Sequence, residues 1–254
     1  MQLSGKHIVI TGAASGIGLG LARRFRQEDA ASLMLADIDG PALEAVAREL
    51  GAQAFVCDVS LEADVAKLVD ASLAAHGRID LFCANAGIIA RGGVETPDAL
   101  WQRMWGTNVM AHVYAARHVL PDMLRRGEGY LLFTVSAAGL LSQINSATYS
   151  VTKHAALALA EWLLITHGAQ GLKVSALCPQ AVESKMTAGG SGGVAGQDGM
   201  LTAAQVAQSV VEGLADERFL ILPHPEVATY FQRKANDYQR WLRGMQRLQE
   251  KFGA

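Results

Sequence analysis

Two side chains able to exchange a proton, Tyr149 and Lys153, lie four positions apart in this sequence. On a helix this spacing places them on one face, about one turn apart. Because a nearby ammonium favours the phenolate, we expect Lys153 to lower the pKa of Tyr149 from its reference value of about 10. Such a tyrosine can pass a proton to or from the oxygen of an alcohol or ketone, and the hydroxyl of Ser136 can hydrogen-bond the same oxygen. Taken alone, the pair also fits two surface residues of a helix.

A glycine-rich segment between an apolar run and a helical pattern is the second motif. It reads Gly12-Ala13-Ala14-Ser15-Gly16-Ile17-Gly18. Glycines at a strand-to-helix turn let the backbone approach a pyrophosphate, and the helix N-terminus offers N–H groups and a partial positive charge. The spacing G-x-x-x-G-x-G differs from G-x-G-x-x-G, but the strand and helix context is the required one. We expect a dinucleotide to bind Gly12, Ser15, Gly16, Ile17 and Gly18.

Two aspartates end the next two apolar runs. Asp37 lies 19 residues after Gly18, where a carboxylate accepts hydrogen bonds from an adenosine ribose and repels a 2′-phosphate. The following residue is Ile38 rather than Arg, and the glycine-rich segment contains no Lys or Arg. These features favour NAD over NADP. Asp58 either contacts the adenine or caps the next helix together with Ser60, and the sequence leaves both alternatives open.

Alternating strands and helices must position these residues. Short apolar runs typical of strands buried on both faces occur at 7–10, 32–36, 54–57, 79–84, 130–135, 173–178 and 218–222. Helical patterns lie between them near 16–28, 41–50, 61–76, 97–126, 146–168 and 202–216. This order predicts an α/β fold with a doubly wound, seven-stranded parallel sheet of the Rossmann type. We expect a single domain over 1–254, with its core at 1–222 and a helical extension at 223–254.

Composition excludes several classes of protein. The chain has 254 residues, half of them apolar, with 22 basic and 24 acidic side chains and a net charge of −2. Disorder and nucleic-acid binding are therefore not expected. Cys57, Cys83 and Cys178 are too few and too scattered for a disulfide framework or a zinc site. No secretory signal is expected, because the N-terminus has no basic region followed by a long apolar stretch. No membrane span is expected either, because the most apolar helical segment is short and contains Glu161. We expect a soluble, cytoplasmic protein that needs no metal.

Three segments have compositions that the sheet alone does not explain. The helical segments 104–116 and 155–165 are apolar nearly all round, which predicts a subunit interface about a two-fold axis unless other parts of the chain cover them. Residues 186–200 contain six glycines, which suits a mobile lid or an idle loop. Residues 226–254 form an amphipathic pattern with six basic and three acidic side chains. We expect one helix packed on its own subunit or a neighbour; a membrane surface or a neighbouring active site are alternatives.

Several motifs occur together in one order. They are Thr11-Gly12-x-x-x-Gly16-x-Gly18, Asn85-Ala86-Gly87, Asn108, Ser136 and Tyr149-x-x-x-Lys153. In this order and spacing they resemble the short-chain dehydrogenase/reductase family over about residues 4–222, in its common single-domain form. The resemblance implies an oxidoreductase in which hydride moves between the substrate carbon and the nicotinamide. It also implies a homo-oligomer, a tetramer or a dimer, in which the helices at 97–126 and 146–168 pair across a two-fold axis.

The resemblance assigns a role to each matching residue. Tyr149 would be the general acid/base, Ser136 would polarise the substrate oxygen, and Lys153 would hold the nicotinamide ribose and lower the pKa of Tyr149. Asn108 would anchor a water molecule in a proton relay to Lys153. The remaining residues expected at the cofactor are Asp58 and Val59 beside the adenine, and Asn85, Ala86, Gly87, Pro179, Val182 and Ser184 along the cleft.

One departure from the family pattern affects the substrate. Gln180 stands after the sixth strand, where the family usually has glycine, so it narrows or polarises the pocket. We expect the substrate to contact Ala138, Leu140, Gln143, Gln180 and Met186. This mostly apolar lining predicts a hydrophobic or aromatic secondary alcohol or ketone. The alternatives are a 3-oxoacyl-thioester reductase, which in this family usually takes NADP, and a non-catalytic NAD-binding sensor.

Overall fold

The sheet has seven parallel strands in the order β3-β2-β1-β4-β5-β6-β7, which confirms the predicted fold class. The structure is a computed structural model, and it describes residues 1–184, 186–187 and 192–252. The strands are β1 (His7–Thr11), β2 (Ser32–Asp37), β3 (Gln53–Val56), β4 (Leu81–Ala84), β5 (Gly129–Thr134), β6 (Leu172–Leu177) and β7 (Leu220–Ile221). Each observed strand overlaps one of the predicted apolar runs.

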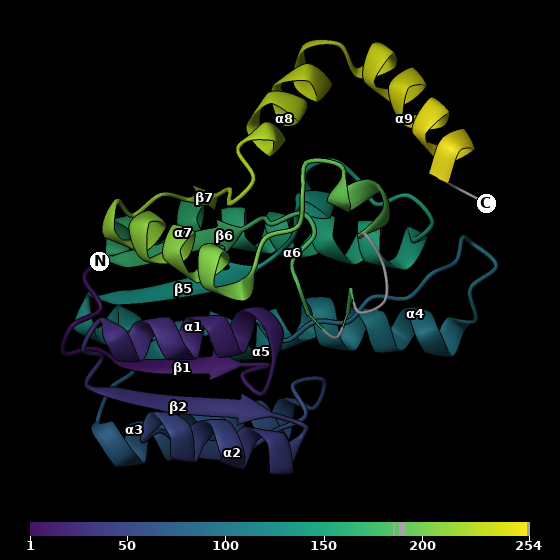
Figure 1. The fold of residues 1–254 in the computed structure, drawn as a ribbon. Coiled ribbons are helices and arrows are strands. Elements are labelled where there is room, and N and C mark those ends of the chain that lie inside the picture. Colours follow the sequence, from purple (N-terminus) through teal and green to yellow (C-terminus); the bar gives the residue numbers. More distant parts are fainter. Residues whose placement is uncertain (185, 188–191, 253–254) are drawn as a thin grey trace.

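Helices cover both faces of the sheet (Figure 1). On one face lie α1 (Gly16–Gln27), α2 (Gly40–Leu50) and α7 (Ala203–Ala215), whose buried residues share a hydrophobic cluster with β1. The other face is covered by α3 (Glu62–His76), α5 (Ala111–Arg126) and α6 (Ala147–His167). Burial on both faces explains why the strands are continuously apolar instead of alternating. All six residues of β5, for example, are buried.

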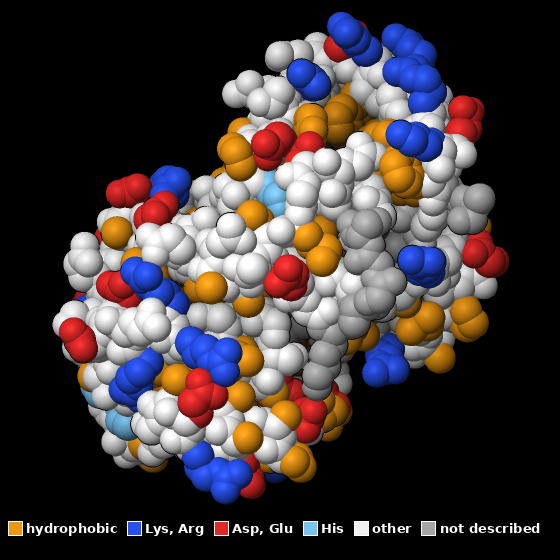
Figure 2. Space-filling view, in the orientation of Figure 1, with side chains coloured by type: hydrophobic (Ala, Val, Ile, Leu, Met, Phe, Trp, Pro, Cys, Tyr) orange, Lys and Arg blue, Asp and Glu red, His pale blue; other side chains and the backbone are white. Residues whose placement is uncertain are grey.

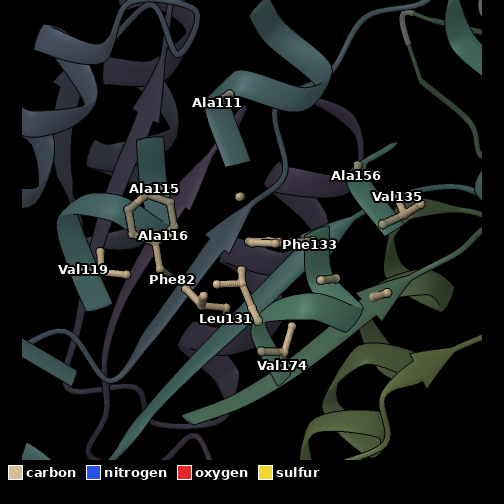
Figure 3. Close-up of a cluster of buried hydrophobic side chains, with 14 of the residues drawn as sticks. Phe82, Ala111, Ala115, Ala116, Val119, Leu131, Phe133, Val135, Ala156 and Val174 are labelled. Atoms are coloured by element: carbon tan, nitrogen blue, oxygen red, sulfur yellow. The ribbon is translucent and has the colours of Figure 1, made fainter. Parts of the chain in front are cut away.

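The core on the second face is built from aromatic and small side chains. Phe82 of the sheet packs against Ala115 and Ala116 of α5 (Figure 3), Phe133 stacks on His112 of the same helix, and both phenylalanines are completely buried. Small residues let the helix approach the sheet closely, and the aromatic rings fill the space that remains. This packing fixes α5 and α6 over the ends of β4 and β5. The helix residues that point toward the sheet edge are therefore held rigidly.

The strand order reverses between β1 and β4. In open parallel sheets a crevice forms at this point, outside the carboxyl ends of the strands. The glycine-rich segment follows β1, Asn85 follows β4, Ser136 follows β5 and Pro179 follows β6. The residues selected from the sequence therefore gather at one edge of the sheet although they are far apart in the chain.

The predicted helix at 97–126 is divided into three parts. A helix α4 (Asp98–Trp105) and α5 flank a π-helical turn over Gly106–Met110, and Asn108 lies in that turn. The wider turn changes the direction in which the side chains of the helix point, and such turns are frequent at functional sites. The apolar periodicity of the segment gives no sign of it.

The C-terminal extension contains two helices instead of the single one expected. They are α8 (Glu226–Asn236) and α9 (Tyr238–Phe252), and together they form an arch above the rest of the molecule (Figure 1). The break falls at Asp237, whose backbone is extended at φ −150° and ψ 89°. Its carboxylate accepts a hydrogen bond from the backbone N–H of Arg240 at 2.9 Å, which caps the start of α9. An aspartate that can cap a new helix thus ends the first one.

Candidate active site

Ser136, Tyr149 and Lys153 meet at the end of β5. The Ser136 hydroxyl accepts a hydrogen bond from the Ala138 N–H at 3.1 Å and begins a short 3₁₀ turn. The Ser146 hydroxyl accepts from the Tyr149 N–H at 3.2 Å, so Tyr149 lies in the first turn of α6. One turn later, Lys153 places its Nζ 5.6 Å from the centre of the Tyr149 ring. The helical spacing predicted from the sequence is therefore present.

The predicted lowering of the Tyr149 pKa is wrong for this structure. Burial raises the pKa of Tyr149, although a hydrogen bond with Ser136 opposes the rise. Burial also lowers the pKa of Lys153, to about 8, and its Nζ donates a hydrogen bond to the Thr134 carbonyl oxygen at 2.9 Å. Sequence spacing predicted the proximity of the two groups but not the cost of burying both. Tyr149 is therefore protonated near neutral pH, which is the form that can donate a proton to a substrate oxygen.

Asn108 is completely buried and fixes the loop after β4. Its Oδ1 accepts from the Ile88 N–H and its Nδ2 donates to the Ile88 carbonyl oxygen, both at 2.9 Å. The same Nδ2 donates to Thr152 Oγ1 on α6 at 3.1 Å. A side chain added at Gly87 would place a Cβ 3.3 Å from Lys153 Nζ and 3.4 Å from Asn108 Oδ1. The structure thus brings Asn108 beside Lys153; the water relay stays a prediction.

The glycine-rich segment fits a dinucleotide phosphate. The N-cap of α1 is Ser15, whose side chain makes no capping hydrogen bond, and the first turn contains no acidic residue. The first N–H groups of the helix are therefore suited to an anion. A Cβ at Gly18 would lie 2.1 Å from the Gly12 carbonyl oxygen, and one at Gly16 would lie 3.3 Å from Ser184 Cβ. Only glycine allows this close approach, and Ile17 packs against the core behind it.

Asp37 lies beside this segment at the end of β2. Its Oδ2 accepts a hydrogen bond from the Ala14 N–H and its Oδ1 accepts one from the Asp39 N–H, both at 3.0 Å. The carboxylate is thereby fixed at the edge of the phosphate loop, the place from which it can select a ribose without a 2′-phosphate. The adjacent Ile38 is exposed and offers no positive charge.

Of the two alternatives for Asp58, the structure shows the local one. Its Oδ1 accepts from the N–H of Ser60 at 2.9 Å and from the Ser60 hydroxyl at 2.7 Å, which holds the turn before α3. Val59 is buried in the core between these residues. The adenine contacts of Asp58 and Val59 stay predictions.

Asn85 joins three strands beneath the cleft. Its Nδ2 donates to the Thr11 carbonyl oxygen and its Oδ1 accepts from the Thr134 hydroxyl, both at 2.9 Å. Ala86 lies so close to the phosphate loop that a Cβ at Gly12 would be 2.9 Å from its Cα. Asn85 therefore shapes the floor of the cleft through contacts within the protein.

The segment after β6 closes the other side of the cleft. The Pro179 carbonyl oxygen accepts from the Ala137 N–H at 2.9 Å. The Thr187 hydroxyl donates to the Val182 carbonyl oxygen at 2.7 Å and accepts from the Ser184 N–H at 3.0 Å. Val182 and Ser184 thus lie in one hydrogen-bonded turn near the phosphate loop, and Pro179 joins the same segment to the turn after β5. Part of the predicted lid, residues 188–191, lies outside the described residues, and its closure stays a prediction.

A cavity of about 1210 Å³ opens from Ser136 and Tyr149 toward the C-terminal arch. Of the predicted substrate contacts, Ala138, Gln143, Gln180 and Met186 line it. Leu140 does not: its side chain is buried in the core, and Leu141 and Ile144 form the wall in its place. A difference of one position in a loop without regular periodicity reverses the direction of a side chain, so sequence alone did not distinguish Leu140 from Leu141.

Gln180 ties the cavity wall together. Its Nε2 donates to Asp198 Oδ2 at 3.0 Å, and its backbone N–H donates to His224 Nδ1 at 3.2 Å. The Tyr230 hydroxyl on α8 donates to the other oxygen of the same carboxylate at 2.9 Å. Replacing the family glycine with Gln180 therefore links the β6 loop to the arch and polarises one wall. Sequence reasoning missed Asp198 and Tyr230, because neither belongs to a motif.

The arch packs on its own chain and forms the roof of the cavity. Lys234 Nζ donates to the Leu140 carbonyl oxygen at 2.6 Å, and Gln249 Nε2 donates to Asn145 Oδ1 at 2.8 Å. Figure 2 shows hydrophobic side chains on the side of the arch that faces the body and basic ones on its outside. The arch residues that line the cavity with apolar surface are Tyr230, Trp241, Met245, Leu248 and Phe252. Packing of the arch on its own chain is therefore the arrangement that the structure shows.

Cys57, Cys83 and Cys178 are buried free thiols. Among the residues that the structure describes, no group of three His, Cys, Asp or Glu side chains is placed to hold a metal ion. The same residues include no helix with the length and apolarity that a membrane crossing requires.

The protein has a Rossmann-type sheet, a glycine-rich loop that leaves the first N–H groups of α1 free for a phosphate, and a Ser–Tyr–Lys group at the carboxyl ends of the strands. Together these features define a nucleotide-dependent oxidoreductase. Comparison with known proteins identifies the family. A family model described as short chain dehydrogenase matches residues 6–191. The chain is 35% identical to 1-deoxy-11-beta-hydroxypentalenate dehydrogenase of Streptomyces exfoliatus, over 94% of this chain and 90% of the relative. It is 34% identical to meso-2,3-butanediol dehydrogenase of Serratia marcescens, over 74% and 76% of the two chains.

Solved structures agree. A short-chain dehydrogenase/reductase of Burkholderia phymatum in complex with NAD is 31% identical, with a TM-score of 0.85 over 94% of this chain and 96% of the other. A 3-ketoacyl-(acyl-carrier-protein) reductase of Brucella melitensis complexed with NADH is 28% identical, with a TM-score of 0.80 over 87% and 96%. The chain belongs to the short-chain dehydrogenase/reductase family.

Proposed function

We propose that this chain transfers hydride between NAD(H) and a bulky, mostly apolar secondary alcohol or ketone, with Tyr149 as the general acid/base. Family membership makes it an oxidoreductase that acts on CH–OH groups and uses NAD. The observation that supports the finer proposal most is the junction of Ser136 and Tyr149 with a cavity of about 1210 Å³ that has apolar side chains on its wall and roof. This volume exceeds the roughly 300–1,000 Å³ of ordinary ligand sites.

Each residue of the group has a distinct task in the reaction. When bound, the nicotinamide supplies or accepts the hydride. The Ser136 hydroxyl hydrogen-bonds the substrate oxygen, and the Tyr149 hydroxyl donates its proton to that oxygen in reduction or accepts one in oxidation. Lys153, as the ammonium, stabilises the charge left on Tyr149 when the proton departs. Asn108 holds the loop after β4 in place against α6, which keeps Lys153 in position.

Replacing Tyr149 with Phe tests this function. The variant removes one hydroxyl and keeps the ring, so NADH binding measured by fluorescence is expected to stay within about threefold of the wild type. The rate with bulky secondary alcohols and NAD is expected to fall by about 10²–10⁴, the usual contribution of a general acid/base. If the variant turns over these alcohols at the wild-type rate, Tyr149 is not the general acid/base. If the protein is instead a non-catalytic sensor, the wild type itself would bind NADH but turn over none of the secondary alcohols tested.

A second candidate is supported by one solved structure. The Brucella melitensis neighbour is a 3-ketoacyl reductase and was solved with NADH, so an Asp37 that selects NAD does not by itself disfavour thioester reduction. The comparison of kcat/KM for a 3-oxoacyl thioester and for a polycyclic secondary alcohol distinguishes the two candidates. We expect the alcohol to be preferred, because the cavity of about 1210 Å³ is large enough for a polycyclic ring system.

The assembly is a further part of the proposal. On the outer side of α6, Ile165 is 82% exposed and Trp162 is 56% exposed, and Trp105 at the end of α4 is 42% exposed. Large exposed side chains on adjacent helices are typical of a subunit interface. They support a homo-oligomer, a dimer or tetramer, that pairs these helices about a two-fold axis. The cytoplasmic location also remains part of the proposal, and the three free thiols are compatible with it.

A further inference from the structure

Exposed arginines stand at the rim of the active-site cavity, on the loop after β4 and on the C-terminal arch. Four arginines line the cavity: Arg91 on the loop after β4, Arg233 on α8, and Arg240 and Arg247 on α9. Arg240 and Arg247 are two helical turns apart, so they lie on one side of α9, beside its inward apolar face. The whole chain has a net charge of −2, so this concentration of positive charge is local.

Carboxylates of the protein do not neutralise these arginines. The only aspartates or glutamates among the described residues lining the cavity are Asp198 and Asp237. Asp198 accepts hydrogen bonds from Gln180 and Tyr230, and Asp237 caps α9. In the described part of the chain, no carboxylate forms an ion pair with Arg91, Arg240 or Arg247.

Arginines on the body of the molecule behave differently. Arg23 pairs with Glu49 through two hydrogen bonds at 2.9 and 3.0 Å. Arg117 pairs with Glu62, with 2.5 Å between Nη1 and Oε1. Exposed arginines at the rim of a cavity, without such partners, are available to a carboxylate or phosphate, which a guanidinium group binds in a fork geometry.

We propose that the substrate carries an anionic group, a carboxylate or a phosphate, remote from its hydroxyl, and that the arginines of the arch bind it. The proposal rests on the function assigned above and names the class of its substrate. With the hydroxyl at Ser136 and Tyr149, the apolar part of the substrate would lie against Trp241, Met245 and Leu248. The anionic group would then reach Arg240 and Arg247 at the edge of the roof.

Matched acids and esters test this proposal. The probes are 3-hydroxycholanate and 12-hydroxyoctadecanoate, each compared with its methyl ester, which is the same apolar secondary alcohol without the charge. Binding to the protein is followed by tryptophan fluorescence, since Trp241 lines the cavity. Turnover is followed with NAD. We expect the acid of at least one pair to bind about tenfold tighter than its ester, and the preference to shrink as salt is raised.

Variants on one helix locate the effect. Arg247→Gln and the double variant with Arg240→Gln are expected to raise KM for the acid and bring the acid-to-ester ratio toward one. Arg243→Gln is the matched control: it removes the same charge one turn away on α9, but Arg243 does not line the cavity. Its acid-to-ester ratio is expected to equal that of the wild type. If Arg243→Gln loses the preference for the acid to the same extent, the effect is one of general charge and not of binding by Arg240 and Arg247.

Other outcomes have defined meanings. Binding of coenzyme A and its 3-oxoacyl thioesters that is lost in Arg247→Gln but not in Arg243→Gln would identify the anion as phosphate and support the proposal. Equal binding of acid and ester, or no binding of any anionic probe, would overturn it. Tyr149-dependent oxidation of a neutral polycyclic alcohol would leave the proposed function intact in that case, so the two failures are distinguishable.

Discussion

A buried histidine in the core gives a quantitative prediction about stability. His112 on α5 is completely buried, and its ring stacks on Phe133 with centroids 4.8 Å apart and an interplanar angle of 7°. Neither ring nitrogen has a hydrogen-bond partner among the described residues. Burial, and secondarily repulsion by Lys153, lowers the pKa of His112 to about 3. The folded protein therefore holds this ring neutral at pH values where an unfolded chain protonates it.

The sign and size of the effect follow from linkage. The unfolded histidine titrates near pH 6.5, so between pH 6.5 and 3 the unfolded state binds more protons. The contribution to stability is fully present above pH 6.5 and is lost as pH falls toward 3. Each pH unit below 6.5 costs about 1.4 kcal/mol, so the loss between pH 8 and pH 5 is about 2 kcal/mol.

The variant His112→Phe isolates this effect. Phenylalanine keeps the stacking on Phe133, removes the titration and removes two buried nitrogens without partners. We expect the free energy of unfolding in urea to fall by about 2 kcal/mol less in the variant than in the wild type when the pH is changed from 8 to 5. All other titrating groups are common to both proteins and cancel in the difference. Unfolding curves that shift in parallel, within about 0.5 kcal/mol, would refute a neutral His112.

Two further substitutions test the phosphate loop and the assembly. Gly18→Ala would place a Cβ 2.1 Å from the Gly12 carbonyl oxygen, so NADH affinity in a fluorescence titration is expected to fall at least about tenfold. Gly168→Ala is the control, because a Cβ there would lie 3.4 Å from Leu164 Cδ1, an ordinary contact far from the phosphate loop. Equal affinities of the two variants would contradict this close contact. Ile165→Glu is expected to reduce the mass measured by light scattering, while Val94→Glu, at a position 91% exposed on a loop, is expected to leave it unchanged. An unchanged mass in both variants would exclude the α6 interface.

The fold and the reacting residues were predictable because they depend on local rules. Strands buried on both faces are continuously apolar, and parallel strands place their carboxyl ends at one edge. The position of Ser136 after its strand and the spacing of Tyr149 and Lys153 therefore determined that these groups would meet. Glycines also carried information, because the close approach at Gly12 and Gly18 tolerates no side chain.

Other features depend on the packed molecule and were not predictable. The pKa of Tyr149 depends on how deeply α6 buries its first turn, and no spacing rule reports that. The direction of Leu140, away from the cavity, depends on a loop without regular periodicity. The π-helical turn at Asn108 leaves no mark in the apolar pattern of the segment. The division of the arch into two helices depends on the capping hydrogen bond of Asp237. In the sequence, Asp237 looks like any other aspartate of a polar helix, so the break could not be predicted.

The molecule separates chemistry from recognition, and the separation has a physical basis. Lys153 and Asn108 are buried and joined by hydrogen bonds to strand ends and loops of the sheet edge, so a change there disturbs the core. The arch contrasts with this: α9 contains no buried residue and contacts the body through a small number of hydrogen bonds, such as those of Asn145. Elements with few buried contacts have low local stability and tolerate substitution. The arginines of α9 can therefore be exchanged without moving Tyr149, and substrate preference can change while the proton-transfer geometry is kept.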